Sequence, residues 1–208
     1  MNRHTTPNSV PIHAQPAHAT RPGVLRASLG LALASLLLFG LLYALLATGI
    51  GRVLFPHAAT GSLVERDGVV VGSSLVAQPF ADDRYFQPRP SAAGYDPMAL
   101  SGSNQARTNP DLRARVEAAR AAVATREAID PEAVPSDLVT QSGGGIDPHI
   151  SPDAARVQIA RVARARGVAP ARIEAAVAAQ TEGPQFGVFG PARVNVLALN
   201  LALDAGTP

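Results

Sequence analysis

The sequence contains no lysine, so all 18 of its cationic side chains are arginines. A P-loop needs a lysine on the nucleotide phosphates, and Schiff-base catalysis needs a lysine amine. The chain therefore cannot carry out either kind of chemistry by itself.

The sequence also contains no cysteine. This absence excludes a disulfide framework, iron–sulfur ligation, thiol catalysis and cysteine-bound zinc. It is compatible with a domain that is exported to an oxidising compartment.

An excess of positive charge is found only in the N-terminal segment. The first 26 residues carry three arginines and no acid, whereas the chain from Arg52 onward has 15 arginines against 16 acidic residues, a net charge of −1. A near-neutral domain lacks the electrostatic footprint of a nucleic-acid-binding protein, so we expect no nucleic-acid partner. At 208 residues the chain has room for one compact domain and an anchor.

The longest apolar run is 25 residues without a charge, Ala27 to Gly51. As a helix it would be roughly 37 Å long, which is enough to cross a hydrocarbon core of about 30 Å. The alternative is a cleavable signal peptide, but its apolar region would be about 7–15 residues long and would end in a small-x-small site. Here the run is longer, and Arg52 to Phe55 follow it. We predict a retained transmembrane helix over residues 24–54.

The arginines before this helix also predict its orientation. The positive-inside rule places a disordered tail, residues 1–23, in the cytoplasm and an exported domain, residues 55–206, on the far side of the membrane.

Within the helix, Gly40, Ala44 and Thr48 recur every four residues and form a smooth stripe that would let another helix approach closely. Small residues scattered through an alanine-rich segment explain the pattern equally well.

The exported part shows both strand and helix signals. Asp67-Gly68 between short apolar runs, 63–65 and 69–71, predicts a hairpin. A proline-rich stretch, residues 77–110, predicts a long ordered loop with a small core of its own. That core would consist of Phe80, Tyr85, Phe86 and Tyr95.

Helix start signals follow at Asn109-Pro110, Ser151-Pro152 and Pro170, with expected stops at Gly167 and before Gly183. Leu112, Val116, Ala119 and Val123 predict the buried stripe of the first of these helices. We predict a last helix over 194–203, although alternating Val194 and Val196 also fit a strand. The fold class is therefore α+β, with more helix than strand.

The polar motifs carry little specific chemistry when each is considered separately. The glycine-rich run Ser142, Gly143, Gly144 and Gly145 could cradle an anion through its backbone amides, or simply be a flexible loop. Ser142, Asp147 and His149 are the residue types of a hydrolase triad, but no nucleophile elbow surrounds the serine. Asp147 and His149 are too few ligands for a metal, so we expect none.

Several segments in a fixed order make the chain resemble the C subunit of the Kdp potassium-transporting ATPase, the KdpC family. The resemblance covers the membrane helix and nearly all that follows. It rests on Gly61-Ser62-Leu63; Val71-Gly72-Ser73 with Gln78 and Phe80; Tyr85 to Ala92; Ser101 to Asn104; Pro135 to Thr140; Ser142 to Gly145 with Asp147 to Ser151; and Val194 to Leu197 with Leu199-Asn200. The sequence departs from the family pattern at Gln105-Ala106-Arg107, where Leu-Gly-Pro is usual, and at Gln141, where a small residue is usual.

The resemblance implies a non-catalytic subunit of a high-affinity potassium uptake pump in the bacterial inner membrane, with a periplasmic domain. Its implied partners are a channel-like potassium-binding subunit, a P-type subunit that hydrolyses ATP and a small single-helix subunit. The absence of lysine agrees, because the phosphorylation loop of a P-type pump, Asp-Lys-Thr-Gly, contains one. The family subunit is described as a catalytic chaperone that raises the affinity of the pump for ATP. The resemblance thus suggests ATP as a ligand of Ser142–Gly145, but the orientation rule puts that segment on the side without ATP.

We expect the helix to pack on the channel-like subunit through Gly40, Ala44 and Thr48, and the exported domain to cap the outer mouth of that subunit. Two alternatives are a membrane-anchored exported hydrolase that uses Ser142 and His149, and an anchored adhesion or sensor module.

Overall fold

The computed structural model describes residues 22–206 of the chain. These residues fall into two units, one that ends at Phe55 and one that begins at Pro56. Nearly all of the tail predicted for residues 1–23 lies outside the described residues. Residues 56–206 are referred to as the C-terminal domain.

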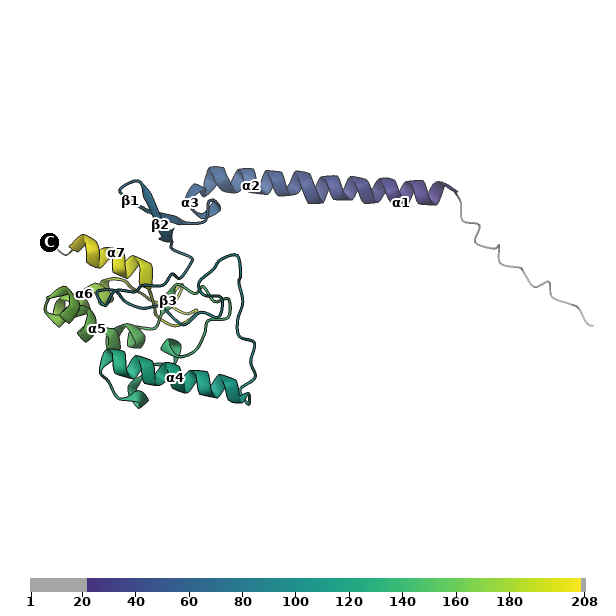
Figure 1. Cartoon of the computed structure of the whole chain (residues 1–208). Helices are drawn as coiled ribbons and strands as arrows, with labels where there is room; N and C mark the ends of the chain where they lie inside the picture. The colour runs from purple at the N-terminus through teal and green to yellow at the C-terminus, as the bar shows by residue number, and fades with distance from the viewer. Residues whose placement is uncertain (1–21, 207–208) are drawn as a thin grey trace, which may run out of the picture. The chain divides into compact units, whose positions relative to one another are not determined.

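The first unit is one uninterrupted helix (Figure 1). It consists of α1 (Pro22–Ser35), a π-helical segment η1 (Leu36–Leu42) and α2 (Tyr43–Leu54). Residues 23–54 form the only helix in the described part of the chain that is long and apolar enough to cross a membrane. The helix begins at Pro22, two residues before the predicted start. Proline is well suited to a first helical turn because it has no N–H to leave unpaired.

The C-terminal domain begins with a short helix and a hairpin. Helix α3 (Pro56–Ala59) precedes β1 (Leu63–Arg66) and β2 (Val69–Ser73), which pair antiparallel with a bulge after Val64. Asp67 and Gly68 join the strands with φ angles of 53° and 76°. A two-residue turn with both φ angles positive matches the twist of a hairpin, and aspartate followed by glycine tolerates it. The predicted hairpin is confirmed.

Four longer helices build the body of this domain, together with the short 3₁₀ helices η2 (Pro131–Ala133) and η3 (Ser136–Leu138). They are α4 (Pro110–Glu127), α5 (Pro152–Arg166), α6 (Pro170–Ala179) and α7 (Val196–Gly206). Asn109 caps α4 by accepting the N–H of Asp111 at 2.8 Å, and Ser151 caps α5 by accepting that of Ala154 at 3.0 Å. Left-handed Gly167 ends α5. The predicted starts of α4, α5 and α6 and the predicted stops of α5 and α6 are confirmed.

A second small sheet has the strand order β3-β5-β4, with both pairs antiparallel. Its strands are β3 (His149–Ile150), β4 (Thr181–Glu182) and β5 (Arg193–Asn195). The predicted helix over 194–203 is therefore wrong at its start, because Val194 and Asn195 belong to β5. Val194 pairs with both Ile150 and Thr181, and these two pairings favour the extended backbone.

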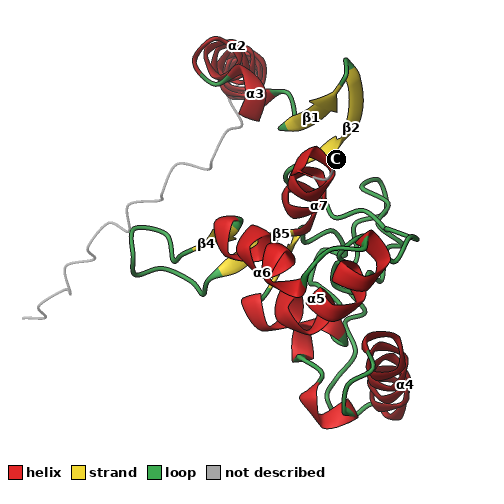
Figure 2. Ribbon diagram, turned by 90° about the vertical axis from the view of Figure 1, so that its left-hand side faces the viewer, coloured by secondary structure: helices red, strands yellow, loops and turns green. Residues whose placement is uncertain are grey.

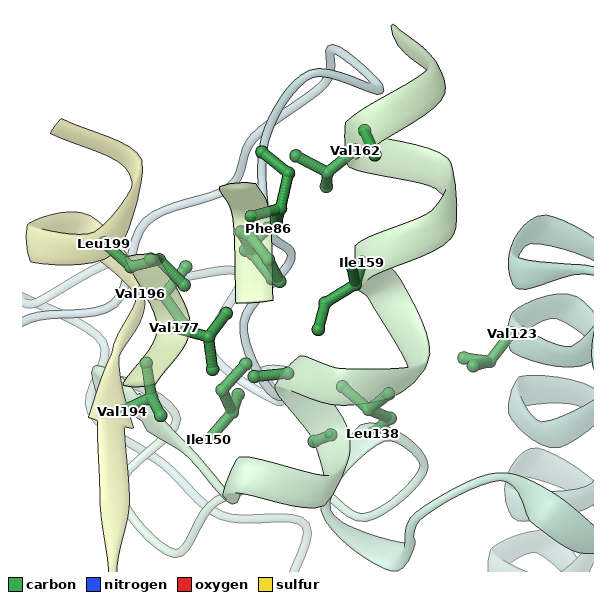
Figure 3. Close-up of a cluster of buried hydrophobic side chains, with 14 of the residues drawn as sticks. Phe86, Val123, Leu138, Ile150, Ile159, Val162, Val177, Val194, Val196 and Leu199 are labelled. Atoms are coloured by element: carbon green, nitrogen blue, oxygen red, sulfur yellow. The ribbon is translucent and has the colours of Figure 1, made fainter. Parts of the chain in front are cut away.

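One hydrophobic core lies between the helices and this sheet (Figure 3). Its members come from segments far apart in the sequence, and they include Phe86, Val123, Leu138, Ile150, Ile159, Val162, Val177, Val194, Val196 and Leu199. The buried stripe predicted for α4 ends in this core at Val123.

The separate small core predicted for residues 77–110 does not form. Phe86 is fully buried in the main core, and Phe80 packs against that core, with its ring centroid 5.5 Å from that of Tyr85. Tyr95 instead donates its hydroxyl to the carbonyl of Arg89 at 2.9 Å. The aromatic residues of this segment thus attach the long loop to the rest of the domain.

Candidate functional site

The predicted glycine-rich segment lies between η3 and β3, and its backbone is partly used inside the domain. Ser142 is buried, and its N–H donates to the carbonyl of Pro90 at 3.4 Å. The N–H of Gly145 donates to the carbonyl of Ser142 at 3.2 Å. Two of the four backbone amides of this segment are therefore already committed and are not free to bind an anion.

Close packing explains why this segment needs glycine at its end. Gly145 has a φ of +75°, and an added Cβ would lie 2.9 Å from both the Cβ of Ala93 and the carbonyl oxygen of Ser101. The hydroxyl of Ser91 also donates to the Gly145 carbonyl at 2.5 Å. By contrast, Gly143 and Gly144 have open space around them. The loop is clamped against residues 91–102, and its binding of ATP remains a prediction.

Asp147 lies at the centre of a small polar cluster. Its Oδ2 is 3.0 Å from a guanidinium nitrogen of Arg89, and its Oδ1 accepts the backbone N–H of His149 at 3.0 Å. The imidazole Nδ1 of His149 lies 3.4 Å from the same Oδ1. Partial burial would raise the pKa of Asp147, but hydrogen bonds from His149 and the charge of Arg89 outweigh burial and lower this pKa.

The cluster does not have the geometry of a hydrolase. The hydroxyl of Ser142 accepts the N–H of Asp147 at 3.4 Å, and among residues 22–206 no hydrogen bond joins Ser142 to His149. Only 4% of Ser142 is exposed. A serine nucleophile must reach both its base and its substrate. The predicted pair of Ser142 and His149 is not brought together.

A cleft of about 530 Å³ borders this cluster, but its charged side chains already have partners within the domain. Asp137 accepts the N–H of Ser151 at 2.7 Å and its hydroxyl at 3.2 Å, while Arg193 pairs with Glu182 at 2.7 Å. Within the described part of the chain no group of three or more metal-ligating side chains is positioned to hold an ion.

A second polar network, which could not be predicted from the sequence, attaches the long loop of residues 77–110 to α4 and α5. The two carboxylate oxygens of Glu127 on α4 accept hydrogen bonds from Nε of Arg161 on α5, at 3.1 and 3.0 Å. Both side chains are almost fully buried. Arg161 also donates to the carbonyls of Asp83 and Tyr85 at 2.7 and 3.0 Å. A buried arginine needs such partners, because an unpaired charge in the interior is very costly.

Asp204 on α7 connects this loop to the hairpin. It accepts hydrogen bonds from Arg66 at 3.0 Å, from Arg166 at 2.8 Å and from the hydroxyl of Tyr85 at 3.1 Å. Partial burial would raise its pKa, but these three donors, Arg166 foremost, lower it. One carboxylate therefore holds β1, α5 and the loop to the last helix.

Two departures from the family pattern occupy different environments. Gln105 accepts a hydrogen bond from Arg115 on α4 at 2.5 Å, so it ties the loop to that helix. The buried Oε1 of Gln141 has no hydrogen-bond partner among the residues described.

The residues predicted as a partner-facing stripe lie along the apolar helix. Gly40 is in η1, whereas Ala44 and Thr48 are in α2. All three are exposed in the isolated chain, and the nearest atom to a Cβ built at Gly40 is the Cγ of Leu36, at 4.0 Å. Their role as a contact face remains a prediction.

Comparison with known proteins gives a consistent result along almost the whole chain. The family described as K⁺-transporting ATPase, c chain, matches residues 25–205. A potassium-transporting ATPase KdpC subunit of Xanthomonas oryzae pv. oryzae is 65% identical over 182 residues, which cover 88% of this chain and 87% of that protein. KdpC subunits of Xanthomonas campestris pv. campestris (62% identical; 88% and 87% covered) and Shewanella putrefaciens (49% identical; 95% and 96% covered) are also similar.

Proposed function

Because the chain belongs to the KdpC family of potassium-transporting ATPase subunits, we propose that it holds the channel-like and ATP-hydrolysing subunits of the pump in one assembly. The observation that carries this proposal is the family match from residue 25 to 205, which includes both the apolar helix and the C-terminal domain. The chain is an accessory subunit in potassium uptake. We propose in addition that its role is to hold the subunits of the pump together.

We place the N-terminus in the cytoplasm and the C-terminal domain on the periplasmic side of the inner membrane. Three arginines without an acid precede the helix, which supports this orientation. The helix then packs against the channel-like subunit through Gly40, Ala44 and Thr48, since small residues allow close helix approach in lipid. The small single-helix subunit completes the membrane part of the complex, and the C-terminal domain caps the outer mouth of the channel-like subunit.

The chain raises the affinity of the pump for ATP, on this proposal, without binding nucleotide itself. The amides of Ser142 and Gly145 already bond inside the domain, and the proposed orientation separates them from cytoplasmic ATP. The effect on ATP affinity then passes through the assembled partners.

Leucine substitutions in the helix test the packing part of the proposal. Gly40→Leu combined with Ala44→Leu should push the partner helix away and release the subunit from the detergent-purified complex. Ala32→Leu is the matched control, because it makes the same kind of change outside the three-residue stripe. The fraction of the chain that is recovered with its partners, together with potassium-stimulated ATP hydrolysis, is the measurement. An intact and fully active complex with both leucines present would refute packing through this face.

A further inference from the structure

The connection between β4 and β5 exposes three large apolar side chains within residues 186–189 of the C-terminal domain. Figure 2 shows it as a loop that extends away from α5 and α6. Its ten residues, 183–192, contain no charged side chain. Phe186, Val188 and Phe189 are 85%, 76% and 66% exposed. We call these three residues the apolar tip.

The backbone of this loop holds the tip in one conformation. Gln185 and Phe189 exchange two backbone hydrogen bonds, at 2.8 and 2.9 Å, and the N–H of Gly187 donates to the carbonyl of Pro184 at 2.9 Å. The tip is therefore presented on an ordered turn, and little conformational entropy remains to be lost when a partner covers it.

Phe186 is a poor choice for the stability of this turn. Its φ is +54°, a left-handed conformation that is unfavourable for a bulky side chain and that asparagine or glycine adopts more readily. With 85% of its surface exposed, its ring gains little from packing inside the domain. An unfavourable backbone conformation combined with an exposed aromatic ring indicates a role outside the fold.

We propose that the apolar tip inserts into an uncharged, apolar recess on another protein chain of the pump. The proposal rests on the assembly role given above and adds to it a contact that the C-terminal domain makes. Phenylalanine is one of the residues enriched in the buried core of protein–protein interfaces.

The area of the tip argues against a second copy of this chain as the occupant. Two phenylalanines and a valine offer roughly 400 Å², whereas a stable interface buries about 800 Å² on each partner. A contact this small is useful when other contacts already hold the two chains together, because tethering raises the effective concentration. A subunit that also carries a membrane helix meets this condition.

The chemistry of the tip argues against a lipid surface. Segments that bind membrane surfaces combine apolar residues with lysine or arginine, or use tryptophan and tyrosine at the headgroup level. The loop has none of these residues between Gly183 and Ala192. An uncharged protein recess is the complementary partner.

Phe186→Asn and Phe189→Ser test the proposal in the full-length chain that is co-expressed with the other pump subunits. Asparagine suits the left-handed position, so Phe186→Asn should leave the thermal midpoint of the free chain unchanged or higher. The same variant should dissociate from the purified complex at a rate at least tenfold higher than that of wild type. Met98→Ser is the matched control, since Met98 is 91% exposed on another loop, and it should have no effect on either quantity.

A photo-reactive phenylalanine analogue at position 186 identifies the occupant. We expect a covalent product with another protein chain of the pump, and no such product from position 98. Crosslinks to lipid alone, to a second copy of this chain or to nothing would overturn the proposal, as would wild-type retention of both variants. If the wild-type chain itself fails to assemble with its partners, the proposed assembly role fails instead.

Discussion

The side-chain amide of Asn200 pairs with both backbone groups of Phe86. Its Oδ1 accepts the Phe86 N–H at 2.8 Å, and its Nδ2 donates to the Phe86 carbonyl at 3.0 Å. Gln158 holds the next residue in the same way, at 2.8 and 3.2 Å from the N–H and carbonyl of Gln87. Two side chains from α7 and α5 thus take the place of a neighbouring β-strand and hold an irregular segment in the core.

Replacing Asn200 with leucine should destabilise the C-terminal domain strongly. The N–H and carbonyl of Phe86 would both remain buried without partners, at a cost of about 1–3 kcal/mol for each group. We therefore expect a loss of about 2–6 kcal/mol in the free energy of unfolding. A urea titration of the full-length chain in detergent, followed by tyrosine fluorescence, measures it. Gln180→Leu, at a half-buried amide with no side-chain hydrogen bond to the described residues, is the control; equal losses in both variants would contradict this account.

Removing the carboxylate of Glu127 should leave the buried charge of Arg161 with only the exposed carboxylate of Asp83, 4.0 Å away, as a counter-charge. Loss of one partner of a buried ion pair costs about 3–5 kcal/mol, so Glu127→Ala should lower the free energy of unfolding by about that amount. The double variant Glu127→Met, Arg161→Leu should lose less free energy of unfolding than the sum of the losses of the single variants Glu127→Met and Arg161→Leu. The reason is that the double variant leaves no buried charge without its partner. Strict additivity of the two losses would show that the pair is not coupled.

Asp204 should make the domain sensitive to acid. Its pKa in the folded state is lower than its ordinary value of 3.8. Its contribution to stability is therefore complete above pH 3.8 and is lost as the pH falls through the folded-state pKa. The difference in free energy of unfolding between wild type and Asp204→Asn should be large at pH 6 and should shrink toward pH 2. Asp67→Asn, in the exposed hairpin turn, controls for the loss of a carboxylate; a difference for Asp204→Asn that stays constant with pH would contradict the prediction.

The glycines at 144 and 145 should respond differently to alanine. A Cβ at Gly145 would contact Ala93 and Ser101 at 2.9 Å and would require a left-handed alanine, so Gly145→Ala should cost about 1–3 kcal/mol. Gly144→Ala meets open space and should leave stability unchanged within about 0.5 kcal/mol. Neither stability nor the ATP concentration that half-saturates the pump should change for Gly144→Ala. A clear rise in the half-saturating ATP concentration for Gly144→Ala would contradict this account and would support direct nucleotide binding by the loop.

Local signals predicted the local elements of this fold well. Asp67-Gly68 gave the hairpin, and Asn109 and Ser151 gave the starts of α4 and α5, because caps and turns depend on residues that are adjacent in sequence. Val194 was assigned to a helix because its strand pairing with Ile150 depends on a residue 44 positions away.

The buried hydrogen bonds of Asn200 and Arg161 could not be predicted from the sequence either, because they also join residues that are distant along the chain. Asn200 and Phe86 are 114 residues apart, and Arg161 and Glu127 are 34 apart. A lone amide or arginine inside a helix looks like a solvent-exposed residue until its distant partner is placed beside it. Ser142 and His149 show the opposite case, because their residue types allow catalysis but the structure places the serine hydroxyl on a backbone amide.

The most direct test of the accessory-subunit account compares the purified pump with and without this chain. Potassium-stimulated ATP hydrolysis and the co-purification of the remaining subunits are measured on the same preparation. We predict that omission of the chain abolishes stable co-purification and potassium-stimulated hydrolysis, and that co-expression of the full-length wild-type chain restores both. A pump that lacks the chain, yet stays assembled and hydrolyses ATP with unchanged potassium stimulation, would contradict the account.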